Sequence, residues 1–543
     1  MENHPTEGDP LKREDGAEGG APTTEIKKGC KELDFAKLTH WRTAVFFFSL
    51  FLCLTVVFAF SFIIPCPVRP QYLISWHRTF NDTATYDFLA IEDANKDKVM
   101  DVLFVVRSSE VSQNKTCAGK GLPSPCVFVV AVDGTDGKTL WETPLEPAFH
   151  WAQCGLKEDG NRSWDCLVSH SDKLTAIEKD KGVAKWQQVQ PVGQPGSVPV
   201  LSLPDLDGDK VGDVALMIHD SESTKVSFLS GESGQQIGST VPLDAVKALD
   251  HIFYRTKGGS HYILLERDSG LFGLSLWGVA AKAKAGLEDA LTKDKHWESK
   301  ANATTGLVLV FKSDQVRQVL KTAHTDSSNL LLVTKTEVVQ VSGRLDTLWM
   351  YNSSSIIGTP SFGHFNKDGV LDVVIEEDVG NDTKKVIILD GVSGGVLWAV
   401  SLQNSPNSPR PASIHTTNSF SVFMFWGLFL MDSNSSVPQM PVESTRRAYM
   451  LHPLYSNVLL ESANLVDHII TFRATLLEHG RHAAYFTLTG PGAAGAEGTV
   501  ILSKRKLKQD VPDSRVVPIS SAGAAETNGN IKEAFNRLRF SDE

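Results

Sequence analysis

The 543-residue chain has no stripe of basic side chains. Its formal net charge is -11 at pH 7, from 53 Lys and Arg against 64 Asp and Glu. Binding to phosphate backbones needs clustered Lys and Arg, so a nucleic-acid partner is not expected. The one short basic run, at 504–508, is interpreted as a solvated loop.

Two short motifs of enzyme active sites are also missing. The chain contains no HExxH zinc-binding pair and no GxxxxGK phosphate-binding loop. The stretch GPGAAG (490–495) matches GxGxxG, but it precedes the β-type run TVILS rather than a helix. A glycine-rich hairpin loop is therefore expected there instead of a dinucleotide site. The sequence predicts a protein that is not an enzyme, and it nominates no catalytic residue.

Helical periodicity is scarce after residue 80, where the main exception is AAKAKAGLEDALTK (280–293), interpreted as a loop helix. Short apolar runs such as DVLFVV, CVFVVAV, DVALMI, DVVIEE and KKVIILD alternate instead with Gly, Asp, Asn and Ser turns. Runs of four to eight β-favouring residues between turn residues are typical of strands. This part of the chain is predicted to be all-β.

A single long apolar run is present, TAVFFFSLFLCLTVVFAFSFII (43–64). It carries no charge and is about as long as a membrane-crossing helix, so it is predicted to be a signal-anchor. A cleaved signal peptide is the alternative. The 42-residue lead and the following PCP, in place of a small-residue cleavage site, argue against it.

The flanks of this run predict its orientation. Basic residues are concentrated before it, at Lys27, Lys28, Lys31, Lys37 and Arg42, against Arg69 and Arg78 after it. The N-terminus is therefore expected in the cytosol, in a single-pass type II topology. All seven NxS/T sequons follow the run and predict a glycosylated ectodomain; they begin at Asn81, Asn114, Asn161, Asn302, Asn352, Asn381 and Asn434.

The cysteines fit an oxidising compartment. Cys117 lies near Cys126, and Cys154 near Cys166, so two local disulfides are predicted, although four cysteines allow three connectivities. Cys66 remains just outside the apolar run. It either forms an intermolecular bridge, which would give a homodimer, or is a free thiol.

Composition divides the rest of the chain. Residues 1–42 are polar and are expected to form a disordered cytoplasmic tail. A juxtamembrane stalk is expected at 65–80, the β domain at 81–505, and a polar C-terminal tail at 506–543 with a short helix around Ile531, Phe535 and Leu538.

The β domain is repetitive. In segments such as VFVVAVDGTDGKTLWETPL (127–145) and VIILDGVSGGVLWAVSL (386–402), a β run enters a polar turn and a second strand follows that often carries Trp. Trp141 and Trp186 are 45 residues apart, and Trp349 and Trp398 are 49 apart. Propeller blades repeat every 40 to 50 residues, roughly. A β-propeller of seven or eight blades is predicted, with each Trp packed on the neighbouring sheet.

Three nine-residue windows share an acidic pattern: DANKDKVMD, DLDGDKVGD and HFNKDGVLD. Oxygens at positions 1, 3, 5 and 9 of a tight loop can converge on a hard cation such as calcium. The candidate ligands are Asp93, Asn95, Asp97 and Asp101; Asp205, Asp207, Asp209 and Asp213; and Asn366, Asp368 and Asp372. An Asx-turn that needs no metal is the alternative.

These windows resemble the FG-GAP repeats of integrin α-subunit propellers, whose loops bind calcium. SFGHFNKDG (361–369) keeps the Phe-Gly pair, and the hairpin repeat is similar to that of quinoprotein-type propellers. With its anchor, the chain resembles the vertebrate group of single-pass type II membrane proteins with FG-GAP repeats. It departs from the pattern at position 6, where Lys98 and Lys210 replace Gly, and at His364, a poor calcium ligand.

Together these features predict a calcium-stabilised propeller at the plasma membrane that serves as an adhesion-like or receptor-like interaction module. Its partner would be an extracellular or membrane protein. A secretory-pathway accessory or chaperone subunit is the alternative, and a quinoprotein-like enzyme the least favoured. No quinone is expected, because no cofactor-binding set can be identified and a fold alone does not imply an activity.

Overall fold

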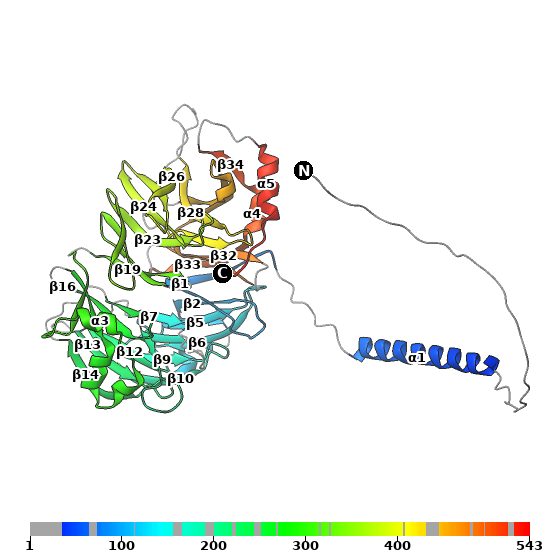
Figure 1. The fold of residues 1–543 in the computed structure, drawn as a ribbon, viewed down its shortest axis with the longest axis horizontal. Helices are drawn as coiled ribbons and strands as arrows, with labels where there is room; N and C mark the ends of the chain where they lie inside the picture. The colour runs from blue at the N-terminus through cyan, green and yellow to red at the C-terminus, as the bar shows by residue number, and fades with distance from the viewer. Residues whose placement is uncertain are drawn as a thin grey trace, which may run out of the picture. The chain divides into compact units, whose positions relative to one another are not determined.

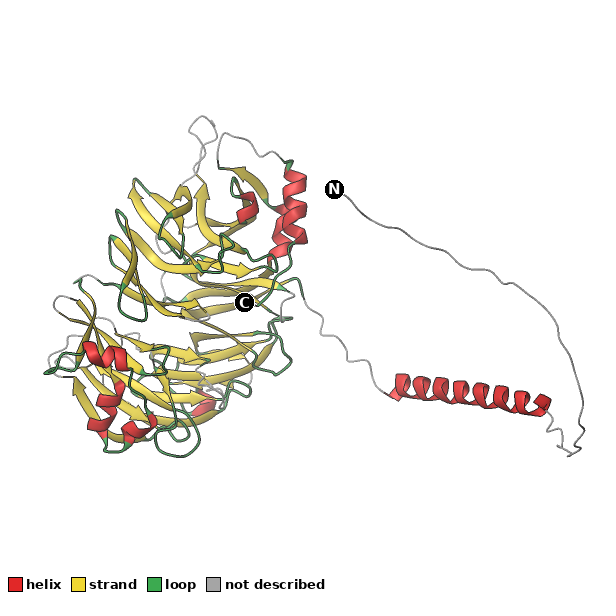
Figure 2. Ribbon diagram, viewed as in Figure 1, coloured by secondary structure: helices red, strands yellow, loops and turns green. Residues whose placement is uncertain are grey.

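The computed structural model describes residues 35–63, 73–112, 115–155, 166–189, 200–219, 224–243, 251–267, 270–313, 316–324, 327–404, 408–429, 445–477, 482–492, 495–519 and 526–542. The chain divides into two units, residues 1–70 and residues 71–543, which are described separately. The first contains helix α1 (Phe35–Ile63), and the second is built mainly from strands (Figure 2).

Helix α1 contains the predicted anchor, although it begins at Phe35, before the predicted start at 43. Its window His40–Ala59 has a mean hydropathy of 2.1, and none of that window is buried. A helix of this length and polarity fits a single-pass membrane anchor. Residues 1–34 of the predicted tail and Cys66 lie outside the described residues.

Four sheets in the middle of the second unit each contain four consecutive antiparallel strands. The first two consist of β7 (Phe149–Cys154), β8 (Cys166–His170), β9 (Lys173–Ile177) and β10 (Ala184–Val189), then β11 (Leu201–Leu203), β12 (Asp213–His219), β13 (Thr224–Leu229) and β14 (Gln236–Leu243). The next two consist of β15 (His251–Arg255), β16 (His261–Arg267), β17 (Gly270–Ser275) and β18 (Leu307–Phe311), then β19 (Gln318–His324), β20 (Ser327–Val333), β21 (Glu337–Val341) and β22 (Thr347–Asn352).

The following nine-stranded sheet consists of two groups of strands, which are joined by a short pairing of β26 with β28. Its first part has β23 (Ile356–Gly363), β24 (Asp372–Gly380), β25 (Thr383–Leu389) and β26 (Val396–Gln403). Its second part has β27 (Ala412–His415), β28 (Ser421–Phe429), β29 (Thr445–Leu451), β30 (Val458–Asp467) and the added strand β34 (Arg515–Pro518). Only the pairs Leu402–Phe429 and Gln403–Leu428 connect β26 to β28, so the two parts are nearly independent.

Strand β1 (Ser75–Glu92) belongs to two four-stranded sheets at once. Its first half, Ser75 to Thr83, pairs with β33, and its second half, Ala84 to Glu92, pairs with β2. One sheet therefore contains β31 (Ile469–Leu476), β32 (Ala483–Thr489) and β33 (Gly498–Lys506), and the other contains β2 (Asp101–Ser108), β5 (Cys126–Val132) and β6 (Thr139–Leu145). The start of the domain is thus paired with its end (Figure 1).

The core lies between consecutive sheets. One buried cluster joins Leu167 and Trp186 to Val214 and Ile218 of the next sheet, and similar clusters fill the other junctions. The last junction joins residues of β32 and β33, including Phe486, to residues of β2 and β5. Sheets packed face to face in succession are the arrangement of a propeller-type fold, so the all-β prediction is confirmed.

The structure differs from the predictions for three segments. Residues 75–80, predicted as stalk, form the beginning of β1, and residues 504–506 of the predicted solvated basic run belong to β33, where Lys504 is buried. The predicted helix at 280–293 is divided into α2 (Leu276–Ala283) and a 3-10 turn (Leu287–Ala290), followed by α3 (Lys295–Lys300). Packing between residues far apart in the sequence determines where these segments begin and end, so local sequence patterns cannot reveal it.

The predicted polar tail is also largely part of the fold. Helix α4 (Leu507–Asp513) and strand β34 follow β33 directly, and α5 (Asn528–Arg537) is the short helix that was expected there. Ile531 and Phe535 of α5 are buried in the same cluster as Trp426 of β28. The C-terminal helices therefore cover the junction between the β27–β30 sheet and the β31–β33 sheet (Figure 1).

Candidate calcium loops and the turns they hold

Each acidic window is the connection between the first and second strand of a sheet, and its ninth residue begins the second strand. These residues are Asp101 of β2, Asp213 of β12 and Asp372 of β24, and all three are fully buried. Because the windows belong to different sheets, the structure does not bring them together into one site. They are three separate copies of one local arrangement.

In each of these sheets, the buried carboxylate connects its own loop, which precedes the second strand, to the turn between the third and fourth strands. Oδ2 of Asp213 accepts a hydrogen bond from the N–H of Leu206 (2.6 Å), and Oδ1 accepts one from the N–H of Gly231 (3.0 Å). The other two carboxylates do the same. Oδ1 of Asp101 accepts from Gly134 (3.0 Å), and Oδ1 of Asp372 accepts from Gly391 (3.0 Å).

A second contact reinforces each connection, through the residue that starts the turn. Asn95 Nδ2 donates to Asp133 (3.5 Å), Ser230 donates to Asp209 (3.3 Å), and Asn366 Nδ2 donates to Asp390 (3.3 Å). Sequence analysis did not identify these turn residues or the turn glycines. Their signal was present in the repeated turns VDGTDGK, LSGESGQ and LDGVSGG, which the acidic windows precede.

Burial dominates the electrostatics of the ninth position. Loss of solvent raises the pKa of Asp101 and of Asp213 to about 7, against the lowering effect of the backbone N–H groups that bind them. The pKa of Asp372 is raised for the same reason. A buried carboxylate is costly to ionise unless hydrogen bonds or a cation compensate it.

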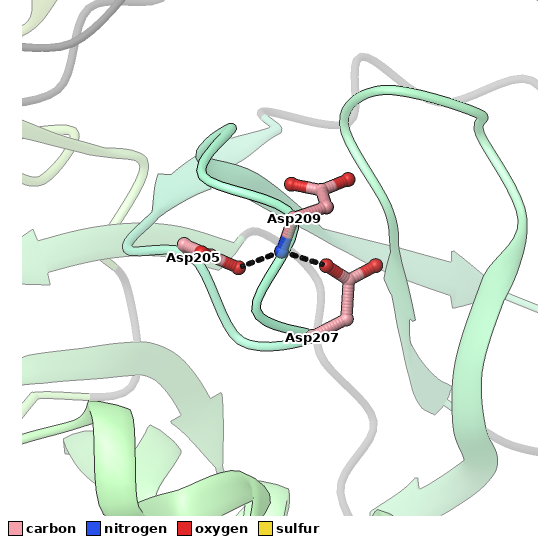
Figure 3. Close-up of side chains that lie close together, drawn as sticks. All are labelled: Asp205, Asp207 and Asp209. Carbon is pink, nitrogen blue, oxygen red and sulfur yellow. Dashed lines mark hydrogen bonds between the residues drawn. The ribbon is translucent and has the colours of Figure 1, made fainter.

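The middle window, 205–213, gathers the most carboxylate oxygens. Ligand atoms of Asp205, Asp207 and Asp209 all lie within 4.8 Å of one another. Figure 3 shows the carboxylates of Asp205 and Asp207 directed at the backbone N–H of Asp209, with distances of 3.2 Å and 3.1 Å. Asp205 also accepts from the N–H of Lys210 (2.7 Å). The donor set is all oxygen, which fits a hard cation, and the backbone amides already relieve part of the repulsion.

The first window, 93–101, has the same plan with fewer charges. Asp93 accepts from the N–H of Lys98 (3.1 Å) through one oxygen, while its other oxygen, Oδ1, is buried with no hydrogen-bond partner among the described residues. A buried carboxylate oxygen without a hydrogen-bond partner fits a missing positive partner. The expected glycine at position 6 is replaced, yet Lys98 and Lys210 both adopt the left-handed conformation, with φ of 69°.

The third window, 364–372, has an imidazole at its first position. Nδ1 of His364 lies 3.2 Å from the carbonyl oxygen of Val370, so the first and seventh positions of this window are joined directly. The His364 ring also packs edge-on against His415, with centroids 5.1 Å apart. Ligand atoms of Asp368 and Asp372 lie within 4.8 Å of those of Asp390, which sequence analysis did not nominate, so these three carboxylates are grouped as closely as those of the second window. Imidazole at this position fits calcium poorly.

The repeated tryptophans bind backbone carbonyls of the neighbouring sheet, in three cases at the same turns. In the described part of the chain, six indole N–H groups donate to backbone carbonyls of the following sheet: Trp76 to Gly134 (3.2 Å), Trp141 to Lys179 (2.7 Å), Trp186 to Gly231 (3.0 Å), Trp297 to Gly343 (2.9 Å), Trp349 to Gly391 (3.0 Å) and Trp398 to Ser456 (2.9 Å). The predicted packing of Trp141, Trp186, Trp349 and Trp398 on neighbouring sheets is observed. Trp76 and Trp297 extend it.

A glycine in the turn provides the surface on which the indole lies. A Cβ added to Gly234 would meet the Trp186 ring at 2.4 Å, and one added to Gly394 would meet Trp349 at 2.6 Å. Both glycines have positive φ, 70° and 72°. Close approach and the left-handed conformation together require glycine here.

Gly231 and Gly391 are therefore held from two sides. The Gly231 N–H is bound by the buried acid of its own sheet, and the Gly231 carbonyl is bound by the tryptophan of the preceding sheet. Asp372 and Trp349 hold Gly391 in the same way, and Asp101 and Trp76 hold Gly134. The acidic loops thus stabilise the turns on which neighbouring sheets dock.

Both predicted disulfides form, Cys117–Cys126 and Cys154–Cys166. Four sequon asparagines lie in described segments, and all are exposed: Asn81, Asn302, Asn352 and Asn381. Asn114, Asn161 and Asn434 lie outside the described residues, as does Cys66.

The described residues of the two glycine-rich motifs lie between strands. Residues 490–492 and 495 of GPGAAG lie between β32 and β33, and the N–H of Gly495 donates to the carbonyl of Thr85 (2.7 Å). The turn GVSGG (391–395) has the spacing GxSxG, but it connects β25 to β26, and the Ser393 hydroxyl donates to Asp390. Neither motif stands at the start of a helix, as a nucleotide loop or nucleophile elbow would require.

Comparisons with known proteins agree with the fold. The chain is 34% identical to Protein FAM234A of Homo sapiens over 99% of this chain and 95% of that protein. It is 26% identical to Protein FAM234B of Mus musculus over 93% of this chain and 83% of that protein.

Among solved structures, the WD40 domain of SCAP from fission yeast has a TM-score of 0.41 and 11% identity, over 79% of this chain and 98% of that one. BamB from Moraxella catarrhalis has a TM-score of 0.36 and 12% identity, over 77% of this chain and 99% of that one. The sequence profile described as the FAM234A/B beta-propeller matches residues 76–541, a range that contains all three acidic loops and nearly every strand. The chain belongs to the FAM234A/B β-propeller family.

Proposed function

We propose that this protein is a single-pass type II membrane glycoprotein whose propeller ectodomain binds another protein at the cell surface. The observation that supports this most directly is the order of the segments along the chain. An apolar helix with no buried residue in its central window is followed by a self-closed sheet domain with exposed sequon asparagines. Propeller folds host many functions, so the partner must be identified by experiment.

The propeller is proposed to have eight blades. Each four-stranded sheet is one blade, and β1 contributes its second half to the first blade and its first half to the last. A strand shared in this way removes the free sheet edge that an open ring would leave. Tryptophan docking from one sheet to the turn of the next supports the same closed order, because Trp76 of the last blade binds Gly134 of the first.

Calcium is proposed as a structural ion of the first and second acidic loops. The oxygen-only donor set of Asp205, Asp207 and Asp209 and the orphaned oxygen of Asp93 support it. Bound there, the ion would supply positive charge to the loop that positions the ninth acid. The third loop is proposed to be metal-free, because His364 already bonds to Val370.

Proximity labelling of the ectodomain on intact cells, followed by cross-linking, tests the interaction. The expected result is one recurrent extracellular or membrane protein that is absent when a different type II ectodomain replaces this one. Finding none would refute the surface-receptor proposal.

Glycan processing distinguishes surface delivery from retention. Complex glycans resistant to endoglycosidase H are expected at the surface. Uniformly high-mannose glycans would favour the second candidate, an accessory or chaperone subunit of the secretory pathway. A non-reducing gel of the full chain, compared with Cys66→Ser, tests the proposed intermolecular bridge at Cys66.

A further inference from the structure

The first strands of three sheets, β1, β23 and β31, line a recess of about 560 Å³. Its lining is completed by the segment that precedes β27 and by Gly492, which follows β32. These elements are neighbours, because β1 contacts β31, and β27 contacts both β31 and β23. A recess of this volume is within the usual range for binding sites of small ligands, roughly 300 to 1,000 Å³.

Two arginines and one acid line the recess: Arg410, Arg473 and Asp87. In the described part of the chain, neither guanidinium group takes part in a hydrogen bond or an ion pair. Other arginines of the same domain are paired with carboxylates, namely Arg107, Arg447, Arg505, Arg515 and Arg537. The two guanidinium groups therefore keep their full donor capacity for a ligand.

The surroundings of the two arginines are unfavourable for positive charge. Arg410 is exposed by its accessible surface, yet the protein atoms around it, and then the nearby charge of Arg473, lower its pKa to about 10. Burial also lowers the pKa of Arg473. Asp87 acts in the opposite direction on both groups but does not overcome burial. Two like charges placed together with only one acid beside them cost stability, which is typical of binding sites rather than of structural positions.

Lys321 of β19 has a lowered pKa, first because of the protein atoms around it and then because of the positive charge of Arg255 on β15, so these two residues lie near each other. Neither of them lines the recess. Within the recess, the two arginines supply positive charge in a chain whose net charge is -11. Attraction of an anion follows from this local charge rather than from the charge of the whole protein.

We propose that the recess is an anion-binding site in which Arg410 and Arg473 together bind a carboxylate or phosphate group. Guanidinium groups bind such oxyanions through paired, charge-assisted hydrogen bonds. Asp87 faces the same space and weakens the binding of simple anions. The group belongs either to a free small molecule or to an acidic segment of a partner protein. This inference does not depend on the cell-surface proposal or on calcium.

Calorimetric titration of the full-length chain in detergent tests the site. The buffer is free of calcium and has constant ionic strength, and the probes are inorganic phosphate, succinate and a triglutamate peptide. Saturable binding of at least one probe is expected. In the variant Arg410→Gln/Arg473→Gln its affinity is expected to fall at least about 10-fold, because two charged hydrogen-bond donors are lost. Asp87→Asn should raise the affinity several-fold, since it removes a competing negative charge.

Arg344→Gln is the matched control, because Arg344 is exposed in the turn before β22, away from the recess. It should leave the affinity unchanged. Tighter binding of triglutamate would identify an acidic partner segment as the source of the anion, and tighter binding of succinate or phosphate a free anion. The proposal is overturned if the wild-type chain binds none of the probes, or if the double variant binds as well as the wild type.

Thermal unfolding without a probe separates binding from folding. The melting temperature of each single variant, Arg410→Gln and Arg473→Gln, is expected to stay constant or rise, because the two positive charges repel each other. If the double variant does not fold, the calorimetric titration is done with the two single variants instead. A marked fall in melting temperature would show that these arginines are structural and would contradict the assignment.

Discussion

The carboxylate of Asp213 accepts a hydrogen bond from the backbone N–H of Gly231 at 3.0 Å, from within a fully buried position. The carbonyl of the same glycine accepts the indole N–H of Trp186 from the preceding sheet. One glycine residue, through its N–H and its carbonyl, therefore connects an acidic loop to the packing of two neighbouring sheets. Four predictions test this relationship and the properties of the loops around it.

The first prediction concerns calcium. The variant Asp207→Ala/Asp209→Ala should lower the melting temperature in about 2 mM calcium and change it little in chelator. Extracellular sites bind calcium at about 10⁻⁴ to 10⁻³ M, so the ion should contribute about 1 kcal/mol under these conditions. Asn366→Ala/Asp368→Ala in the third loop is the matched control, and its loss should be the same in both conditions. Equal losses for Asp207→Ala/Asp209→Ala would show that the second loop is a metal-free turn.

Position 6 of the loops gives the second prediction. Lys210 has φ of 69°, a conformation that costs a non-glycine residue about 1 kcal/mol, so Lys210→Gly should raise the free energy of unfolding by up to that amount. Gly369→Ala should lower it by about 1 kcal/mol, although a Cβ at Gly369 would meet no atom within 4 Å. Urea unfolding of both variants measures the two changes. If Gly369→Ala were neutral, backbone strain would not govern these turns.

These loops also show how much the sequence could predict. The two disulfides were predicted from cysteines close in sequence, and the packing of the blade tryptophans from the repeat that carries them. The structure confirms both predictions. Trp76 was missed because its sheet exists only when β1 pairs with β33, more than 400 residues later. Arg410 and Arg473 were missed because only the meeting of β1, β23 and β31 brings them into one recess. Local patterns do not contain such long-range pairings.

The third prediction is a pH dependence from two buried histidines. Burial lowers the pKa of His170 and His452 to about 4 in the folded protein, from 6.5. Between pH 6.5 and 4 the unfolded chain therefore binds more protons, and each histidine should reduce stability as the pH falls, by about 1 kcal/mol per pH unit. Asp101 and Asp213, with raised pKa values, contribute the opposite slope between about pH 4 and 7.

A comparison of variants isolates the histidine contribution from that of the acids. His170→Gln keeps a polar group near Thr175, and His452→Asn keeps an acceptor for the N–H of Leu454. Each variant should lose less stability than the wild type between pH 6.5 and 5, measured by urea unfolding at each pH. Parallel pH profiles for the wild type and both variants would contradict the assignment of neutral, buried imidazoles.

The fourth prediction addresses the docking arrangement. Asp213→Asn should destabilise the protein by about 2 kcal/mol, because an amide NH₂ would face a backbone N–H donor. Trp186→Phe should cost about 1 kcal/mol through loss of the indole hydrogen bond, while the aromatic packing is largely kept. The two side chains bind the two successive peptide groups that flank the Cα of Gly231, so their effects should not be independent.

The most direct test is a double-mutant cycle for Asp213→Asn and Trp186→Phe, measured by urea unfolding. The account predicts a coupling of at least about 0.5 kcal/mol, since either change alone already loosens the shared turn. The control cycle pairs Asp213→Asn with Trp349→Phe, which binds Gly391 of a different sheet, and its effects should add. Additive effects for Asp213 and Trp186 as well would contradict the claim that the acidic loops stabilise the docking of neighbouring sheets.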